Sequence, residues 1–164
     1  MTRAGGTQMI AVNDGQIASI SLAASTGEIE QSRVAVARSS NADVRSLAQD
    51  LVTVHTAAIA RERALAASSV IIPAEHDVSQ TLQTMSRAIV ARLQNGKEWE
   101  FDQMYLSSRV DVHQMVLTLI DETLLPQVEV DALREELMSR RVSLMQHLER
   151  ARELLAMHNT GTLP

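Results

Sequence analysis

Cysteine is absent from the 164-residue chain, which excludes a thiol nucleophile, thiolate metal ligands and disulfides. The absence does not fix the compartment, because cysteine-free proteins also occur in the cell envelope. No run of 18 apolar residues exists, so we expect no membrane-spanning helix. The first 12 residues lack the basic and apolar regions of a secretory leader. We therefore expect either a cytoplasmic protein or an exported one whose leader this sequence does not show.

Basic clusters and aromatic residues are also scarce. Fifteen Lys and Arg stand against 20 Asp and Glu, and no aromatic residues are interleaved with a basic block, so a nucleic-acid surface is excluded. Aromatics make up 2% of the chain and all lie between Trp99 and Tyr105, which leaves Leu, Val, Ile, Ala and Met to build the core. Such a core favours closely packed helices over a sheet, within a single domain.

Apolar residues recur at spacings of three and four over four long segments, which predicts four long helices. Asn13 with Gln16 is typical of a capping box for the first helix, and Asn41 can cap the second. Pro126 should close the third. The predicted helices span residues 13–38, 41–67, 98–126 and 129–157.

Residues 68–97 lose the long helical period and should form a crossover. The segment from Val70 to Pro73 is predicted to be extended, because a residue before proline is disfavoured in the α region. Asp77 with Gln80 predicts a capping box for a short helix that ends beside Gly96, a residue suited to a left-handed C-terminus. A hairpin, a long crossover and a second hairpin predict an all-α, ferritin-like antiparallel four-helix bundle with a short extra helix in the crossover.

The domain boundaries follow from the same pattern. We expect residues 1–12 to be a flexible arm, residues 13–157 to form the bundle and residues 158–164 to be a frayed tail.

Three polar residues interrupt the inward-facing stripes of the predicted helices: Glu28, His55 and His113. At about 1.5 Å rise per residue, Glu28 and His55 lie roughly 18 and 21 Å from the first hairpin turn. If the crossover returns the chain to that turn, His113 lies about 22 Å along the next helix. The three side chains should then share one layer, with Glu135, Glu136 or Arg140 of the last helix near the same height.

Two interpretations of this layer remain open. Buried Glu and His residues can hold a transition metal such as iron, zinc or copper. Alternatively they hydrogen-bond one another, with Arg140, and fix the helix register without any cofactor. Val52 and Val110 stand where the Glu of a Glu-x-x-His metal motif would be, so we expect the hydrogen-bonded layer.

A second polar cluster is predicted at the other end of the bundle, where His147 should lie near Asp102 and Tyr105. Packing in the core together with one hydrogen bond is enough to explain His147 at this position. The methionines occupy positions where Met commonly fills gaps in a core. No nucleophile turn or phosphate-binding glycine loop is present, so we expect no catalytic residues and no enzyme.

Short motifs in a fixed order support a family resemblance. They are Asn13 to Ile17, Gly27 to Glu30, Ser40 to Val44, His55, Phe101, Asp102, Tyr105, His113, His147 and Leu148. In these motifs the chain resembles the bacterial ferritin-like domain-of-unknown-function family 4142, whose members are often labelled outer membrane proteins. The resemblance covers about residues 13–157.

The resemblance implies an exported, periplasmic or envelope-associated four-helix domain without an established activity. The chain departs from the family pattern at two positions: Val54 replaces the usual Asp before the histidine, and Leu47 replaces a Phe. Loss of that Asp removes one possible partner of His55 and so disfavours a metal site.

Two functions are therefore compared. The first is a non-catalytic envelope bundle, monomeric or homodimeric, that acts in stress tolerance or by binding an unidentified protein partner. The second is a metal-binding ferritin-like protein that uses Glu28, His55 and His113. We expect the first.

Overall fold

The computed structural model describes residues 10–163 and contains no strand in that range. The predicted all-α class is confirmed, and each predicted long helix is present within a few residues of its expected bounds. The chain folds into five long helices and a short segment between the last two. The helices are α1 (Asp14–Arg38), α2 (Ala42–Ser68), α3 (Asp77–Asn95), α4 (Glu98–Leu119) and α6 (Asp131–Asn159), with η1 (Ile120–Leu124) and α5 (Leu125–Gln127) between α4 and α6.

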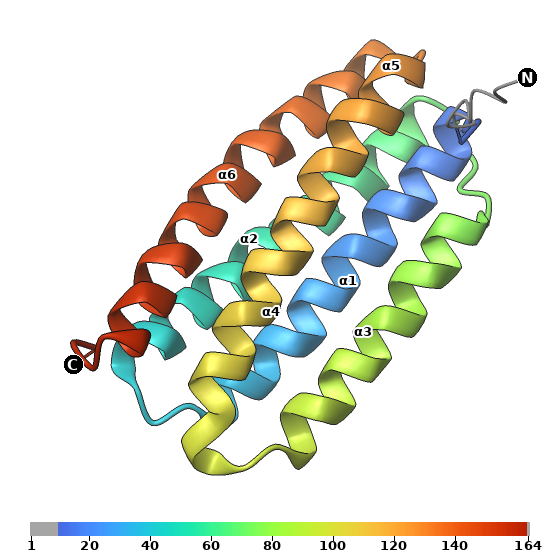
Figure 1. Ribbon diagram of the computed structural model, residues 1–164. Coiled ribbons are helices and arrows are strands. Elements are labelled where there is room, and N and C mark those ends of the chain that lie inside the picture. Colours follow the sequence, from blue (N-terminus) through green and yellow to red (C-terminus); the bar gives the residue numbers. More distant parts are fainter. Residues whose placement is uncertain (1–9, 164) are drawn as a thin grey trace, which may run out of the picture.

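The helices run alongside one another in two hairpins joined by α3 (Figure 1). Helices α1 and α2 form one antiparallel hairpin, α4 and α6 form the other, and α3 lies along α1. The crossover returns the chain to the α1–α2 turn, because Arg38 at the end of α1 donates to the carbonyls of Leu93, Gln94 and Gly96. Helix α4 therefore starts at the same end of the molecule as α2.

Side-chain caps set where α1 and α2 begin. The predicted capping box of Asn13 and Gln16 is present, and Asn41 Oδ1 accepts from two backbone amides at the start of α2. The predicted box of Asp77 and Gln80 is wrong. His76 caps α3 instead, since its Nδ1 accepts the Val78 amide while the His76 amide donates to a serine side chain.

The crossover helix has the bounds expected from the sequence. Helix α3 has 19 residues and buries Ser79, Leu82, Ser86 and Leu93. Gly27 lets it approach α1 closely, because a Cβ on Gly27 would lie 2.9 Å from Ser86 Oγ. The helix expected in the crossover thus forms an outer layer on α1.

The predicted ends of α3 and α4 also need correction. Gly96 has φ −66° and ψ 155°, so it is extended and not left-handed, and a Cβ there would meet the side chain of Met104. Pro126 does not close α4. The α-helix gives way at Leu119 to a π-helical turn, and Pro126 lies in the short helix that follows.

The predicted N-terminal arm and C-terminal tail lie partly outside the described residues. Residues 1–9 of the predicted arm and residue 164 of the predicted tail lie outside the described part of the chain. The carbonyl of Ile10 and the amide of Val12 hydrogen-bond to the side chain of Gln127. Helix α6 extends to Asn159, two residues beyond the expected end of the bundle.

Two apolar clusters fill the two ends of the bundle. One includes Ile17, Ile120 and Leu133, and the other includes Leu51, Phe101 and Leu154. The segments between them on α1, α2, α4 and α6 carry buried polar and charged side chains. No helix among residues 10–163 combines the length and the apolar character needed to cross a membrane.

Candidate metal centre

Glu28, His55 and His113 lie in one layer of the bundle, as their heights predicted. All three are buried, and Glu28 Oε1 lies 3.7 Å from His113 Nδ1. One ligand atom of His55 and one of His113 lie within 4.8 Å of each other. The long crossover therefore places the first hairpin and α4 in the register that this layer requires.

His147 belongs to the same layer, which corrects its predicted position beside Asp102 and Tyr105. Its ring centroid lies 6.1 Å from that of His55 and 5.8 Å from that of His113. One ligand atom from each of the three histidines lies within 4.8 Å of the others. Tyr105, two helical turns from His113 on α4, hydrogen-bonds Ser32 Oγ at 3.0 Å instead.

The error has a simple geometric cause. The expected heights on α6 were counted from a turn near Leu125, but the helical path continues to Gln127 and the chain turns at residues 128–130. Moving the turn by about four residues moves the level opposite His113 by about eight residues along α6. His147 therefore takes the place expected for residues 135–140.

Each histidine is held by one ring nitrogen. His113 Nδ1 lies 2.8 Å from the Arg109 carbonyl oxygen, which can only accept, so Nδ1 carries the proton. His147 Nε2 lies 3.3 Å from Asp50 Oδ2, and His55 Nδ1 lies 3.2 Å from Ser25 Oγ. These contacts fix the orientation of all three rings.

The other nitrogen of each ring has no hydrogen-bond partner among the described residues. These atoms are His55 Nε2, His113 Nε2 and His147 Nδ1, and each is buried. Leaving a buried polar atom unpaired costs about 1 to 3 kcal/mol. Three such atoms in one cluster therefore call for a common partner.

Burial keeps two of these imidazoles neutral. It lowers the pKa of His55 to about 3, despite the opposing effect of Glu28. Burial also lowers the pKa of His113, although Glu28 again acts in the opposite direction. A neutral imidazole is the form that ligates metals, because its second nitrogen keeps a free lone pair.

Arg109 is the functional neighbour that the sequence analysis missed. It is fully buried, and its guanidinium forms an ion pair with Glu28. Burial alone would raise the pKa of Glu28, but Arg109, His113 and His55 outweigh it and lower this pKa to about 2. Glu28 is thus a carboxylate, and its Oε1 has no hydrogen-bond partner within the described chain.

A signal for Arg109 was present in the sequence. Arg109 stands four residues before His113 and four after Tyr105, so it lies on the same inward stripe. It was passed over because arginine is rarely buried unless paired.

Arg140, expected as a partner of the layer, forms a separate buried cluster. Its Nη2 donates to Glu62 Oε1 at 2.5 Å, and its Nη1 donates to the Ser21 carbonyl oxygen at 2.9 Å. Burial raises the pKa of Glu62, while Arg140 lowers it. Of the other expected neighbours, Glu136 pairs with Arg61 at the surface and Glu135 is exposed.

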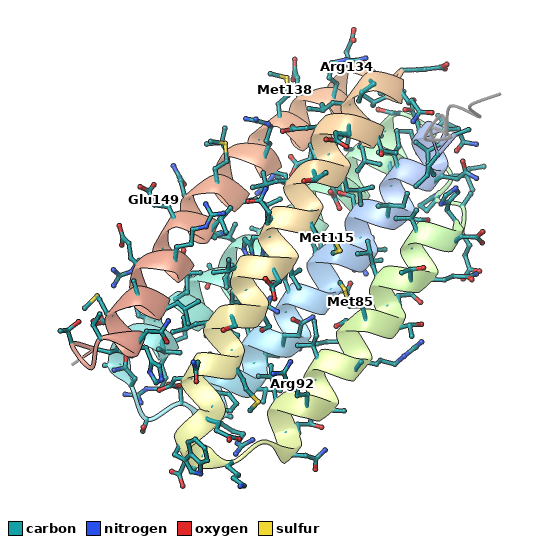
Figure 2. The ribbon with its side chains drawn as sticks, viewed as in Figure 1. Met85, Arg92, Met115, Arg134, Met138 and Glu149 are labelled. Carbon is teal, nitrogen blue, oxygen red and sulfur yellow. The ribbon has the colours of Figure 1, made fainter. Side chains whose placement is uncertain are left out.

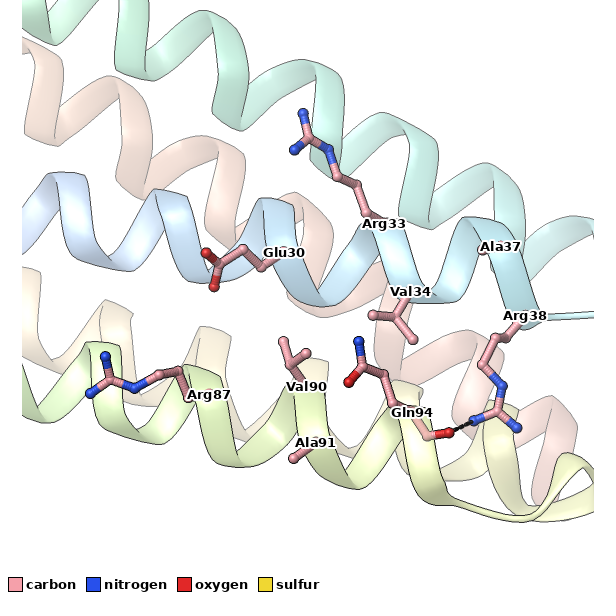
Figure 3. A pocket seen from close by; sticks show the side chains of 9 residues that line it. All are labelled: Glu30, Arg33, Val34, Ala37, Arg38, Arg87, Val90, Ala91 and Gln94. Atoms are coloured by element: carbon pink, nitrogen blue, oxygen red, sulfur yellow. Dashed lines mark hydrogen bonds between the residues drawn. The ribbon is translucent and has the colours of Figure 1, made fainter.

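A groove at the surface lies between α1 and α3 (Figure 3). Charged side chains of both signs line it, including Glu30, Arg33, Arg38 and Arg87. None of its lining residues carries a buried atom that lacks a partner. The histidine layer is therefore the better candidate for a functional site.

Comparisons with known proteins place the chain in a family but assign no activity. The sequence model of a family described as Domain of unknown function (DUF4142) matches residues 1–154. No curated protein and no solved structure matches the chain.

Proposed function

The chain belongs to the DUF4142 family, and we propose that this member binds one transition-metal ion inside its helical bundle. His55, His113 and His147 are the ligands. The observation that carries the proposal is that each of these three buried histidines offers a ligand atom within 4.8 Å of the others, while each ring also has one nitrogen without a partner among the described residues.

This arrangement favours the metal over the hydrogen-bonded layer expected from the sequence. In a self-sufficient layer each imidazole acceptor would face a donor, because buried polar groups are normally paired. Here the Arg109 carbonyl and the Asp50 carboxylate accept from His113 and His147, and one buried nitrogen of each of the three rings meets no donor among the described residues. A cation would give these nitrogens a common partner.

The outer contacts are those that ligating histidines usually make. Such a histidine commonly binds a carboxylate, a backbone carbonyl or another polar group through its second nitrogen, which fixes the tautomer. Asp50 and the Arg109 carbonyl are two of these groups. Val54 stands where the family pattern has an Asp beside His55. In this chain Asp50, one turn earlier on α2, provides a carboxylate, and it contacts His147 and not His55.

The ligand set indicates the class of metal. Three imidazoles and a nearby carboxylate suit divalent zinc, iron, copper or cobalt, whereas a chain without cysteine offers no thiolate for Cu(I). Glu28 offsets the charge of Arg109, so this pair adds no net positive charge beside the cation. Glu28 Oε1, which has no hydrogen-bond partner among the described residues, is a candidate fourth ligand.

We further propose the ferritin-like arrangement for this bundle. Two antiparallel hairpins joined by a long crossover support it, since that connectivity separates ferritin-like bundles from simple up-and-down ones. Metal ligands drawn from three helices and projecting inward also agree with it.

For the cellular role we propose a non-catalytic metal-holding protein of the periplasm or cell envelope. The family resemblance supports the location. The lack of catalysis is supported by the burial of all three ligands, which are at most 7% exposed. Fractionation of cells that express the gene with its natural start tests the location, and recovery in the cytoplasm would contradict it.

Cobalt titration of tag-free, chelator-stripped protein tests the metal site. One equivalent of Co²⁺ should produce the visible absorption of nitrogen-ligated cobalt, and His55→Ala, His113→Ala and His147→Ala should each abolish tight binding. His158→Ala, which removes a histidine from the same helix as His147, should bind normally. No absorption in the wild type, or equal binding by all four variants, would contradict the proposal.

A further inference from the structure

The three histidines differ in how close their outer partners lie to the surface. His55 is held by Ser25, which is fully buried, and His113 by the carbonyl of the fully buried Arg109. Asp50, the partner of His147, has a side chain that is 61% exposed. At His147, the side chain of Asp50 links the candidate centre to the surface. The partners of His55 and His113 are buried.

A hollow in the surface opens over this point, between α2 and α6. His147 forms part of its lining, together with Asp43, Leu47, Asp50, Gln146 and Arg150. His147 itself is 7% exposed, whereas His113 is inaccessible. The hollow therefore reaches the outermost of the three ligands.

The charges in the hollow favour a cation at Asp50. Arg150 lies 3.8 Å from Asp43 and 3.1 Å from Glu153, so its charge is shared between two carboxylates. Within residues 10–163, His147 is the only group recorded within ion-pair distance of Asp50. Asp50 is thus a carboxylate in the hollow that no Lys or Arg of the described residues approaches within ion-pair distance, because Arg150 is paired with Asp43 and Glu153.

We propose that Asp50 and His147 form the uptake route of the metal centre, an inference that rests on the proposed function. A hydrated divalent cation binds the Asp50 carboxylate first, in the hollow. The His147 ring then moves aside, the cation passes between α2 and α6 to His55 and His113, and the returning ring supplies the third nitrogen. Asp50 acts in this route as a positioning residue for the ring and as a temporary ligand for the cation.

Stopped-flow mixing of stripped protein with Co²⁺ tests the route, because it separates the association rate from the dissociation rate. Asp50→Asn should lower the association rate constant about tenfold, since a local carboxylate accelerates capture of a cation. The association rate of the wild type should fall with added salt, and that of Asp50→Asn should fall less. A residue that merely oriented His147 would change the dissociation rate alone.

Glu149→Gln is the matched control. Glu149 lies two residues beyond His147 on the outward side of α6 (Figure 2), and it is exposed and outside the hollow. The substitution removes the same charge, and its association rate should stay within about twofold of the wild type because charges outside the hollow are screened. Leu47→Ala, which widens the hollow, should accelerate both association and dissociation.

The outcomes separate the two proposals. Wild-type association in Asp50→Asn, with normal tight binding, would overturn the uptake route and leave the metal centre intact. Equal slowing by Asp50→Asn and Glu149→Gln would also overturn the route, because the effect would then reflect net charge. A wild-type protein that binds no Co²⁺ would overturn both proposals.

Discussion

At the scale of single residues, the candidate centre depends on a buried charge pair that faces it. Glu28 and Arg109 are almost wholly inaccessible, and each leaves one polar atom without a partner in the described chain. Such a pair contributes little net stability, but breaking it leaves an uncompensated charge in the core. The pair therefore limits which residues can occupy this layer.

Removal of one partner should be more harmful than removal of both. Arg109→Met should lower the free energy of unfolding by about 3 to 5 kcal/mol, because it strands the Glu28 carboxylate. Arg109→Met combined with Glu28→Gln should recover most of that loss. Urea denaturation of the stripped proteins measures both values, and a double variant less stable than Arg109→Met would show that the pair does not act as described.

The predictability of the site also differs from residue to residue. Glu28, His55 and His113 were found because a polar residue on an apolar stripe is visible in the sequence, and because helix rise converts residue number into height. His147 is on such a stripe too, but its height depended on the exact position of a turn. Arg109 is on such a stripe as well, but arginine is rarely buried unless paired, and only the packed structure shows its ion pair with Glu28 and the contact of Asp50 with His147 on α6.

At the scale of elements, the cap of α3 and the α4–α6 connection are where sequence and structure differ. The cap of α3 is a histidine, a residue that the usual capping pattern does not include. The π-helical turn Ile120–Leu124 inserts an extra residue into the helical path, and no local sequence signal marks it. The π-helical turn and the later chain reversal at residues 128–130 explain why the existence of α6 was predictable while its exact register was not.

Packing of α3 against α1 gives a test at this scale. Gly27→Ala places a Cβ about 3 Å from both Cβ and Oγ of Ser86, so α3 must shift. We expect a loss of about 1 kcal/mol in unfolding free energy, although alanine is intrinsically the better helix former by 0.5 to 1 kcal/mol.

Ser86→Gly in the same chain supplies the control. It removes both clashing atoms, so the pair Gly27→Ala and Ser86→Gly should show a favourable coupling in a double-mutant cycle. Thermal and urea unfolding measure the cycle. Additive effects would mean that α3 does not approach α1 at this point.

At the scale of the whole molecule, the crossover is the feature that makes a shared centre possible. It returns the chain to the α1–α2 turn, so that α4 runs beside α1 and brings His113 to the level of His55. The turn after α5 then brings His147 down α6 to that level. Apolar clusters at both ends of the bundle enclose this polar layer and hold it away from water.

X-ray absorption spectroscopy of the protein loaded with one equivalent of Zn²⁺ tests this account most directly, because it counts the imidazoles bound to the metal. The account predicts three imidazole nitrogens at about 2.0 Å, the usual zinc–nitrogen distance, with any remaining ligand an oxygen. The His147→Ala protein should show two imidazoles or no ordered site. A wild-type spectrum with at most one imidazole and a shell of water oxygens would contradict the central claim.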